Sequence, residues 1–272
     1  MRQAGKGGRR SPSNGRAIRF RDIATGVIPA SPPYVDYLLH LGGQWQMLGN
    51  NAAGNCVAVT WANERRLVTA TLTNQTNYPS QDQVWQFYKT QNSNFDPNGS
   101  SATNGPGSSA DNGMDIQTGL NELHQNGGPD GVKLVAFAKV DLGNVAEVRA
   151  AVASCGSLWT GVFVYQNNQD EFGAEQPWDF DSSSPQDGGH SVLTGGYGVA
   201  PQGITQLQGD EKFITWAEET SFTDNYWTHA VEEGWVCIWP EHLGTSSFEQ
   251  GVSGPALASV YQQVTGSQLV LP

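Results

Sequence analysis

Cysteine is scarce in this chain, and its number is odd. Only Cys56, Cys155 and Cys237 occur among 272 residues, so the three thiols cannot all pair with one another. A disulfide scaffold is therefore not expected. Synthesis in a reducing compartment fits this composition better.

Long apolar runs are missing as well. No stretch is long enough to cross a bilayer, and the charged N-terminus has no apolar segment of the kind found in secretory signals. We expect cytoplasmic synthesis and no membrane partner. Release by lysis, or packaging into a particle such as a virion, stays open.

The common cofactor motifs are also absent. There is no phosphate-binding Walker loop, no dinucleotide glycine pattern and no internal repeat. His40, His124, His229 and His242 do not have the spacing of zinc ligands. We therefore expect neither a cofactor nor a metal.

Acidic residues are missing from the first 21 positions, which form a basic arm. Seven of the 14 Lys and Arg residues lie there, whereas residues 22–272 carry 7 basic and 26 acidic residues. A basic, Gly- and Ser-rich arm is typical of an interaction tail that binds an acidic partner, a protein assembly or nucleic acid. A solvated, disordered terminus is the alternative.

The remaining chain is long enough for one large domain. Hydrophobic spacing and turn residues predict helices first and mostly strands later, which favours an α+β fold with two lobes. We place a helical lobe at about 48–130, a β lobe at about 131–240 and a helical extension at 241–272. Helices are predicted at 81–91, 116–124, 144–155, 223–233 and 254–264. Ser80 with Gln83, and Asn144 with Glu147, have the spacing of helix cap pairs. Strands are predicted at 133–140, 157–165, 190–197, 204–207, 212–216 and 235–239, and long loops at 92–113 and 166–189.

The stretch from Leu48 to Val68 is the segment around which we expect the fold to be organised. A turn rich in Gly and Asn leads into a run of good helix formers, so we expect a helix that starts at Cys56. Asn55 is the expected N-cap. The apolar residues that follow predict a buried helix. A thiol on the first turn of such a helix should ionise more easily, because the helix dipole stabilises negative charge there. This is the arrangement of a nucleophilic cysteine.

The sequence separation between this cysteine and one histidine is informative. His190 follows Cys56 by 134 positions, within the spacing of about 130–150 residues found in papain-type peptidases. Several segments resemble that family in the same order. They are Gly54-Asn55-Cys56, Gly189-His190-Ser191-Val192, Gly196-Tyr197-Gly198 and Ile214-Thr215-Trp216-Ala217. The chain resembles a divergent papain-like protein of the kind found in bacteria and phages.

The resemblance implies a two-lobe fold in which a central nucleophile helix faces an antiparallel sheet or barrel. Cys56 would attack an amide or ester carbonyl, and His190 would move its proton. Asn50 stands where the family has an oxyanion-hole glutamine. Gly113 and Met114 would line the specificity pocket. Gly189 and Trp216 would also contact the substrate.

The sequence departs from the family at its third catalytic position. Ile214 falls where the family has an asparagine, and isoleucine cannot orient an imidazole. Thr215, Glu218, Glu219 and Asp187 are the candidate substitutes, and the sequence does not choose among them. Val57 also replaces the usual aromatic residue after the nucleophile.

Two functions remain open. The first is a papain-like cysteine peptidase or amidase that acts on a peptide or amide. The second is a catalytically silent protein of the same fold, such as a phage virion component docked through residues 1–21.

Overall fold

One antiparallel sheet and a set of helices make up the chain. The computed structural model describes residues 17–26, 30–199, 210–269 and 271. The helices are α1 (Phe20–Ile23), α2 (Cys56–Thr73), α3 (Gln81–Lys89), α4 (Ile116–Gln125), α5 (Val145–Cys155), α6 (Gln166–Gly173), α7 (Asp224–Ala230), α8 (Ser246–Gly251) and α9 (Gly254–Thr265). The strands are β1 (Val35–Asp36), β2 (Ala136–Lys139), β3 (Leu158–Tyr165), β4 (Gln186–Tyr197), β5 (Glu211–Thr215), β6 (Glu218–Phe222) and β7 (Val231–Ile238).

The sheet has the strand order β2-β7-β3-β4-β5-β6, and β1 pairs with β4. Every pairing is antiparallel. The register places His190 opposite Val162 of β3, near the middle of the sheet. The hairpin between β5 and β6 brings Thr215 opposite Glu218.

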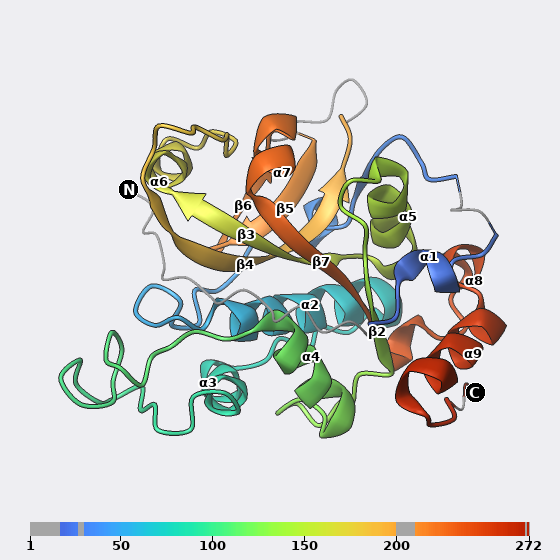
Figure 1. Cartoon of the computed structure of the whole chain (residues 1–272), viewed down its shortest axis with the longest axis horizontal. Coiled ribbons are helices and arrows are strands. Elements are labelled where there is room, and N and C mark those ends of the chain that lie inside the picture. Colours follow the sequence, from blue (N-terminus) through green and yellow to red (C-terminus); the bar gives the residue numbers. More distant parts are fainter. Residues whose placement is uncertain (1–16, 27–29, 200–209, 270, 272) are drawn as a thin grey trace.

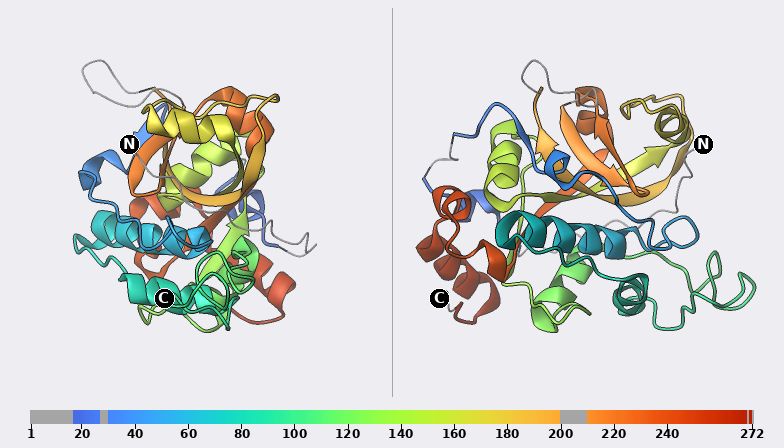
Figure 2. Two further views of the ribbon diagram at one scale, coloured as in Figure 1. Left: turned by 90° about the vertical axis from the view of Figure 1, so that its left-hand side faces the viewer. Right: turned by 180° about the vertical axis from the view of Figure 1, so that it is seen from behind.

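Two apolar cores lie on the two sides of this sheet. One joins α2, α3 and α4 to one face through residues such as Trp61, Trp159 and Leu193. The other joins α1, α5, α7, α8 and α9 to the opposite side. Figure 1 shows α2 running beneath the curved sheet, with α3 and α4 below it, and the rear view in Figure 2 shows the same layers. The predicted α+β fold with a helical lobe and a β lobe is confirmed.

Helix α2 is the central buried helix that the sequence predicts. Every residue from Cys56 to Thr69 is buried, because the helix is packed between the sheet and the other helices of its lobe. The expected N-cap bond is wrong, however. The Asn55 side chain makes no capping hydrogen bond; its amide instead donates to the Leu48 carbonyl at 2.9 Å.

Most of the other predicted elements are confirmed within a few residues. Ser80 and Gln83 form the expected capping box at α3, and the Asn144 side chain caps α5. The segment 166–189, predicted as a loop, instead starts with α6, whose Asn168 side chain caps the Tyr165 amide. The elements β6, α1 and α8 were not predicted. The predicted strand 204–207 lies outside the described residues.

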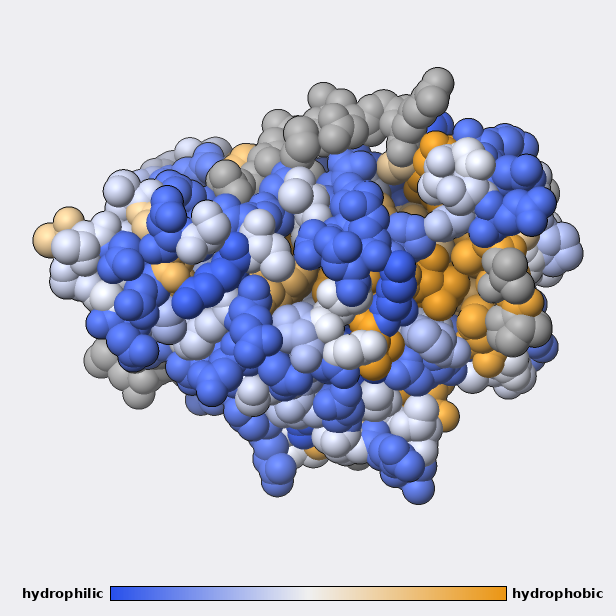
Figure 3. All heavy atoms as spheres, turned by 90° about the horizontal axis from the view of Figure 1, so that it is seen from below, coloured by the Kyte–Doolittle hydropathy of each residue, from blue (hydrophilic) through white to orange (hydrophobic). Residues whose placement is uncertain are grey.

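The described end of the basic arm lies against the body. Ile18 and Phe20 are buried in the core on the side of the sheet opposite α2, and the Lys139 amide donates to the Ile18 carbonyl at 2.7 Å. No helix within the described ranges is long and apolar enough to span a membrane. The face seen in Figure 3 is mostly hydrophilic, with apolar side chains gathered toward the end that carries α8 and α9.

A buried ion-pair network joins α2 to the rest of the molecule. The Arg65 guanidinium donates to Asp130 at 2.8 Å and to both carboxylate oxygens of Glu241, at 2.6 and 3.2 Å. Its side chain is 1% exposed, and its cation lies 4.5 Å above the Trp239 ring.

Arg65→Met should lower the free energy of unfolding by about 3–5 kcal/mol, because it leaves two carboxylates near the core without their cation. Urea denaturation measures this loss. Arg21→Met is the matched control, since the Arg21–Asp141 pair spans 3.4 Å with both side chains more than 40% exposed, and it should cost less than about 1 kcal/mol. Equal losses in the two variants would contradict this account of the network.

Candidate active site

A tight loop delivers Cys56 to the start of α2. Gly49 has a φ of +83° and packs so closely on Trp85 that a Cβ would come within 2.1 Å of the ring. Leu48 also has a positive φ, of 48°. The loop therefore turns sharply against α3, and glycine is required at the closest approach.

Asn50 holds this loop together. Its side-chain amide donates to Asn55 Oδ1 at 3.1 Å and to the Ala53 carbonyl at 3.4 Å. The residue is 2% exposed. Asn50 is thus part of the loop before Cys56, and both of its amide hydrogens have partners within that loop.

Asp111 ties the long polar loop to the same place, a role that sequence reasoning missed. Its carboxylate accepts from the Gly54 amide at 2.9 Å, from the Tyr88 hydroxyl at 2.5 Å and from the Gly107 amide at 2.8 Å. The Tyr88 hydroxyl in turn accepts from the Gly113 amide at 3.1 Å. Because these bonds link residues far apart in the chain, the loop composition alone could not predict them.

The Cys56 thiol is buried rather than open, with the residue 1% exposed. Burial raises the pKa of the Cys56 thiol to about 12, although the backbone N–H groups of Ser191, Val57 and Cys56 itself favour the thiolate. The expectation of an easily ionised thiol is therefore not met in this conformation, because desolvation outweighs the start of the helix.

His190 lies on β4 beside two indole rings that also pack against each other, with their centroids 5.4 Å apart. Its ring centroid is 5.1 Å from that of Trp216 and 6.5 Å from that of Trp178. The residue is 4% exposed, and burial lowers the pKa of the His190 imidazole to about 3. The imidazole is therefore a neutral base at physiological pH, and its Nδ1 has no hydrogen-bond partner among the described residues.

Thr215 is the group behind the imidazole. Its Oγ1 lies 2.7 Å from His190 Nε2. Of the other candidates, Glu219 accepts from the Trp45 indole at 2.7 Å, and Asp187 is bonded by Gln169. In the tautomer in which Nε2–H donates to Thr215, the neutral ring keeps its lone pair on the unpartnered Nδ1.

A strained hairpin turn holds Thr215 and Trp216 in place. Trp216 and Ala217 form the two-residue turn between β5 and β6, with φ values of 45° and 66°. Paired positive φ values suit the twist of a hairpin but usually call for Gly or Asn. Non-glycine residues there store strain, which occurs most often at functional sites.

Helix α2 and strand β4 lie against each other next to the two predicted catalytic positions, but among the described residues no hydrogen bond joins the Cys56 thiol to the His190 imidazole. Thr60, one turn after Cys56, has its hydroxyl 3.0 Å from the Ser191 hydroxyl. The Ser191 backbone N–H also favours the thiolate form of Cys56. Since Ser191 directly follows His190, the first turn of α2 lies against the strand segment that carries the imidazole.

A small cavity opens beside His190. It measures about 20 Å³, and its lining comprises Val57, Ile116, Gly161, Val162, Phe163, Gly189, His190, Ser191, Glu232 and Glu233. Gly189 is thus part of this lining. Gly113 and Met114 are not, and Met114 is fully buried.

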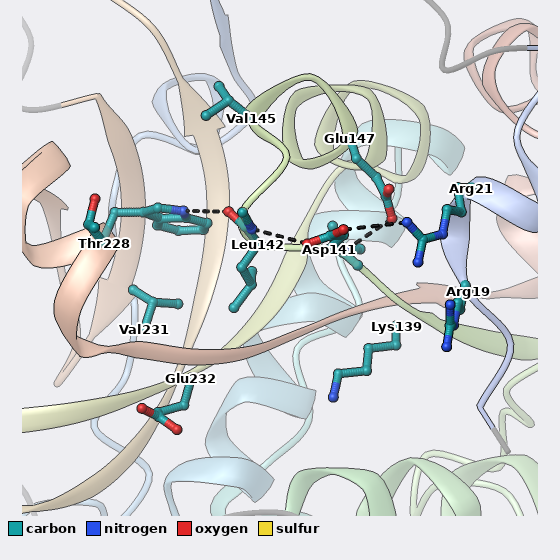
Figure 4. A pocket seen from close by; sticks show the side chains of 13 residues that line it. Arg19, Arg21, Lys139, Asp141, Leu142, Val145, Glu147, Thr228, Val231 and Glu232 are labelled. Atoms are coloured by element: carbon teal, nitrogen blue, oxygen red, sulfur yellow. Dashed lines mark hydrogen bonds and ion pairs between the residues drawn. The ribbon is translucent and has the colours of Figure 1, made fainter. Parts of the chain in front are cut away.

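Two larger cavities also open on the described part of the chain. One, of about 650 Å³, shares Glu232 with the small cavity and has Arg19, Arg21 and Lys139 along one side (Figure 4). The other, of about 600 Å³, includes Ala217 of the strained turn, together with Trp45 and Glu219. The linings of these two cavities include neither Cys56 nor His190.

Comparison with solved structures identifies the architecture. Xylellain, a cysteine protease from Xylella fastidiosa, superposes with a TM-score of 0.63 over 88% of this chain and 97% of its own, at 17% identity. The fold is papain-like. A procathepsin B from Trypanosoma congolense gives 0.54 over 86% of each chain at 12% identity. A digestive procathepsin L from Tenebrio molitor larval midgut gives 0.52 over 82% of this chain and 75% of its own, also at 12% identity.

The amino-acid sequence gives no match comparable to that of the fold. No protein-family model and no curated protein sequence matches it. The papain-like assignment therefore stands on the fold, and the identities of 12–17% carry nothing about activity. What this chain does has to be argued from its own residues.

Proposed function

We propose that the chain is a cysteine peptidase or amidase in which Cys56 is the nucleophile and His190 the general base. The observation that carries this is the imidazole. It is bonded through Nε2 to Thr215, packs beside Trp216, and carries an unpartnered Nδ1 on the strand that faces the Cys56 end of α2. A buried polar atom without a partner is rare and calls for an explanation. A thiol proton donor supplies one.

The reaction follows from two neutral groups. His190 Nδ1 accepts the thiol proton as the Cys56 sulfur attacks the carbonyl carbon, which forms a carbon–sulfur bond and an oxyanion. The imidazolium then returns the proton to the leaving amine, and a thioester remains on Cys56. Water, deprotonated by His190, hydrolyses this thioester and restores the free thiol.

The start of α2 provides the oxyanion donor. The Cys56 backbone N–H lies in the first turn, where helix amides have no partner within the helix. Asn50 is our proposed second donor. To serve, its amide would exchange the 3.4 Å bond to the Ala53 carbonyl, which is close to the limit of a hydrogen bond, for one to the oxyanion.

An extended peptide suits this site better than a small amide. The cavities of about 650 and 600 Å³ each have room for several residues, and we propose that they receive parts of the peptide outside the small cavity at His190. The lining of the small cavity at His190 contains Gly161 and Gly189, which have no side chain to block a peptide backbone. We propose that Gly189 and Trp216 contact the chain on either side of the scissile bond, and that Gly113 and Met114 support the wall that holds it.

A trapped acyl-enzyme tests the proposal. The full chain, mixed with a peptide p-nitrophenyl ester and quenched in acid, should gain the mass of one acyl group on the tryptic peptide that contains Cys56. Cys56→Ala is the matched control, because it retains Cys155 and Cys237, which are both buried. Acylation that persists in this variant, or no acylation of the wild type, would favour the catalytically silent alternative.

A further inference from the structure

A cluster of carboxylates far from Cys56 along the chain remains unexplained by the proposed function. Asp210, Glu211 and Asp224 each offer an oxygen, and these oxygens lie within 4.8 Å of one another. Glu211 is the first residue of β5, and Asp224 is the first residue of α7. The cluster therefore joins the start of a central strand to the start of a helix.

Glu211 is the unusual member of the cluster. Its side chain is 4% exposed, and its Oε2 has no hydrogen-bond partner among the described residues. Its carboxylate lies close to those of Asp210 and Asp224. A buried carboxylate that faces two further carboxylates costs free energy unless something compensates its charge.

The nearby cations compensate only part of this charge. The Arg149 guanidinium of α5 donates to Asp210 Oδ2 at 2.8 Å. The Lys212 ammonium donates to two carbonyls, of Gly198 at 2.6 Å and Asp210 at 3.3 Å. Within the described part of the chain no ion pair reaches Glu211 or Asp224.

The spacing matches a single hard cation. Calcium binds oxygens at about 2.3–2.6 Å, so two of its ligands on opposite sides are about 4.6–5.2 Å apart. Three oxygens within 4.8 Å of one another can therefore all touch one ion. Asp224 is exposed, which leaves a solvent side for entry and for water ligands.

We propose that Asp210, Glu211 and Asp224 bind a divalent cation of the calcium class. The ion would receive the unpartnered Glu211 oxygen and pin the start of β5 to the start of α7. Because β5 ends at Thr215, the same strand carries this site at one end and the His190 contact at the other. The site is nevertheless independent of any catalysis by Cys56.

Thermal unfolding of the full chain at pH 8 tests the proposal, with EDTA compared against millimolar CaCl₂. Calcium should raise the Tm by about 5 °C or more, as expected for a site well above its Kd. Glu211→Gln keeps the shape and should abolish the shift. Asp224→Asn should reduce the calcium-dependent Tm shift. Because Asp224 is exposed, this variant still tests the site if the Glu211 variant does not fold. Glu249→Gln, an exposed carboxylate on α8, is the matched control and should respond like the wild type.

Equilibrium dialysis with radioactive calcium measures the stoichiometry directly. One ion bound per chain in the wild type, lost in Asp224→Asn and retained in Glu249→Gln, is the expected result. The proposal would be overturned if calcium did not shift the wild-type Tm. It would also be overturned if Glu211→Gln and Asp224→Asn showed the same shift and the same calcium binding as the wild type. Neither readout depends on peptide cleavage, so the two proposals fail separately.

Discussion

Cys56→Ala, His190→Ala and the double variant should all lower kcat/KM for peptide hydrolysis by about the same factor, at least ~10³-fold. Residues that act as one unit are strongly non-additive, because removing either one disables the same step. The thiol without its base is a poor nucleophile at neutral pH, and the imidazole without the thiol has nothing to activate.

A fluorogenic peptide library, read as initial rates, measures these losses. Cys155→Ala is the control: this cysteine is fully buried at the end of α5, away from the proposed pair, and its replacement should leave kcat unchanged if the variant folds. Losses that multiply in the double variant would show that Cys56 and His190 act independently.

Thr215→Val should lower kcat by about 10- to 100-fold while KM changes little. Valine has the shape of threonine but lacks the hydroxyl that lies 2.7 Å from His190 Nε2, so the ring loses its orientation and the tautomer with Nδ1 free loses its support. Thr215→Ser retains the hydroxyl and should recover most of the rate.

The pH profile separates orientation from simple destabilisation. Because burial lowers the pKa of His190 to about 3, the wild type should keep its neutral base down to mildly acidic pH. Its kcat/KM should therefore stay level from pH 8 to pH 5 and fall only as the pH approaches the pKa of the buried imidazole.

Thr215→Asn introduces the residue type that the family has at its third catalytic position. This variant should restore the rate, as Thr215→Ser should. A Thr215→Val enzyme with unchanged kcat would contradict the proposed orienting role.

Local patterns in the sequence predict the elements that carry the site. The turn before Cys56 and the apolar run after it predict α2, and the Ser80–Gln83 and Asn144–Glu147 spacings predict helix starts that the structure confirms. These signals work because a helix start and a buried helix face are determined by residues only three or four positions apart.

Contacts between distant segments could not be predicted in this way. Four residues were equal candidates for the group behind His190, and only the β5–β6 hairpin decides for Thr215. That hairpin turns at Trp216 and Ala217, two residues that give no turn signal. The same holds for Asp111, whose bonds to the Gly54 amide and the Tyr88 hydroxyl join the polar loop to the Cys56 turn and to α3.

Burial also changed the expected electrostatics. The position of Cys56 on the first helical turn predicts a lowered thiol pKa, yet enclosure by β4 and the rest of its lobe raises it to about 12. The sequence records the helix start but not the loss of solvent around it. The pair is therefore neutral in this conformation, and the proton has to move during the reaction.

Alkylation of Cys56 by iodoacetamide is the most direct measurement of the central claim, that His190 takes the proton of this thiol. Rates at pH 5 to 8, read by mass spectrometry with Cys155 and Cys237 as internal references, should be fastest at Cys56 and nearly independent of pH. In His190→Ala the rate at Cys56 should fall at least tenfold at pH 6 and then rise with pH, as for an unassisted thiol. If Cys56 reacts no faster than the other two cysteines, and His190→Ala leaves its rate unchanged, the Cys56–His190 pair does not exist.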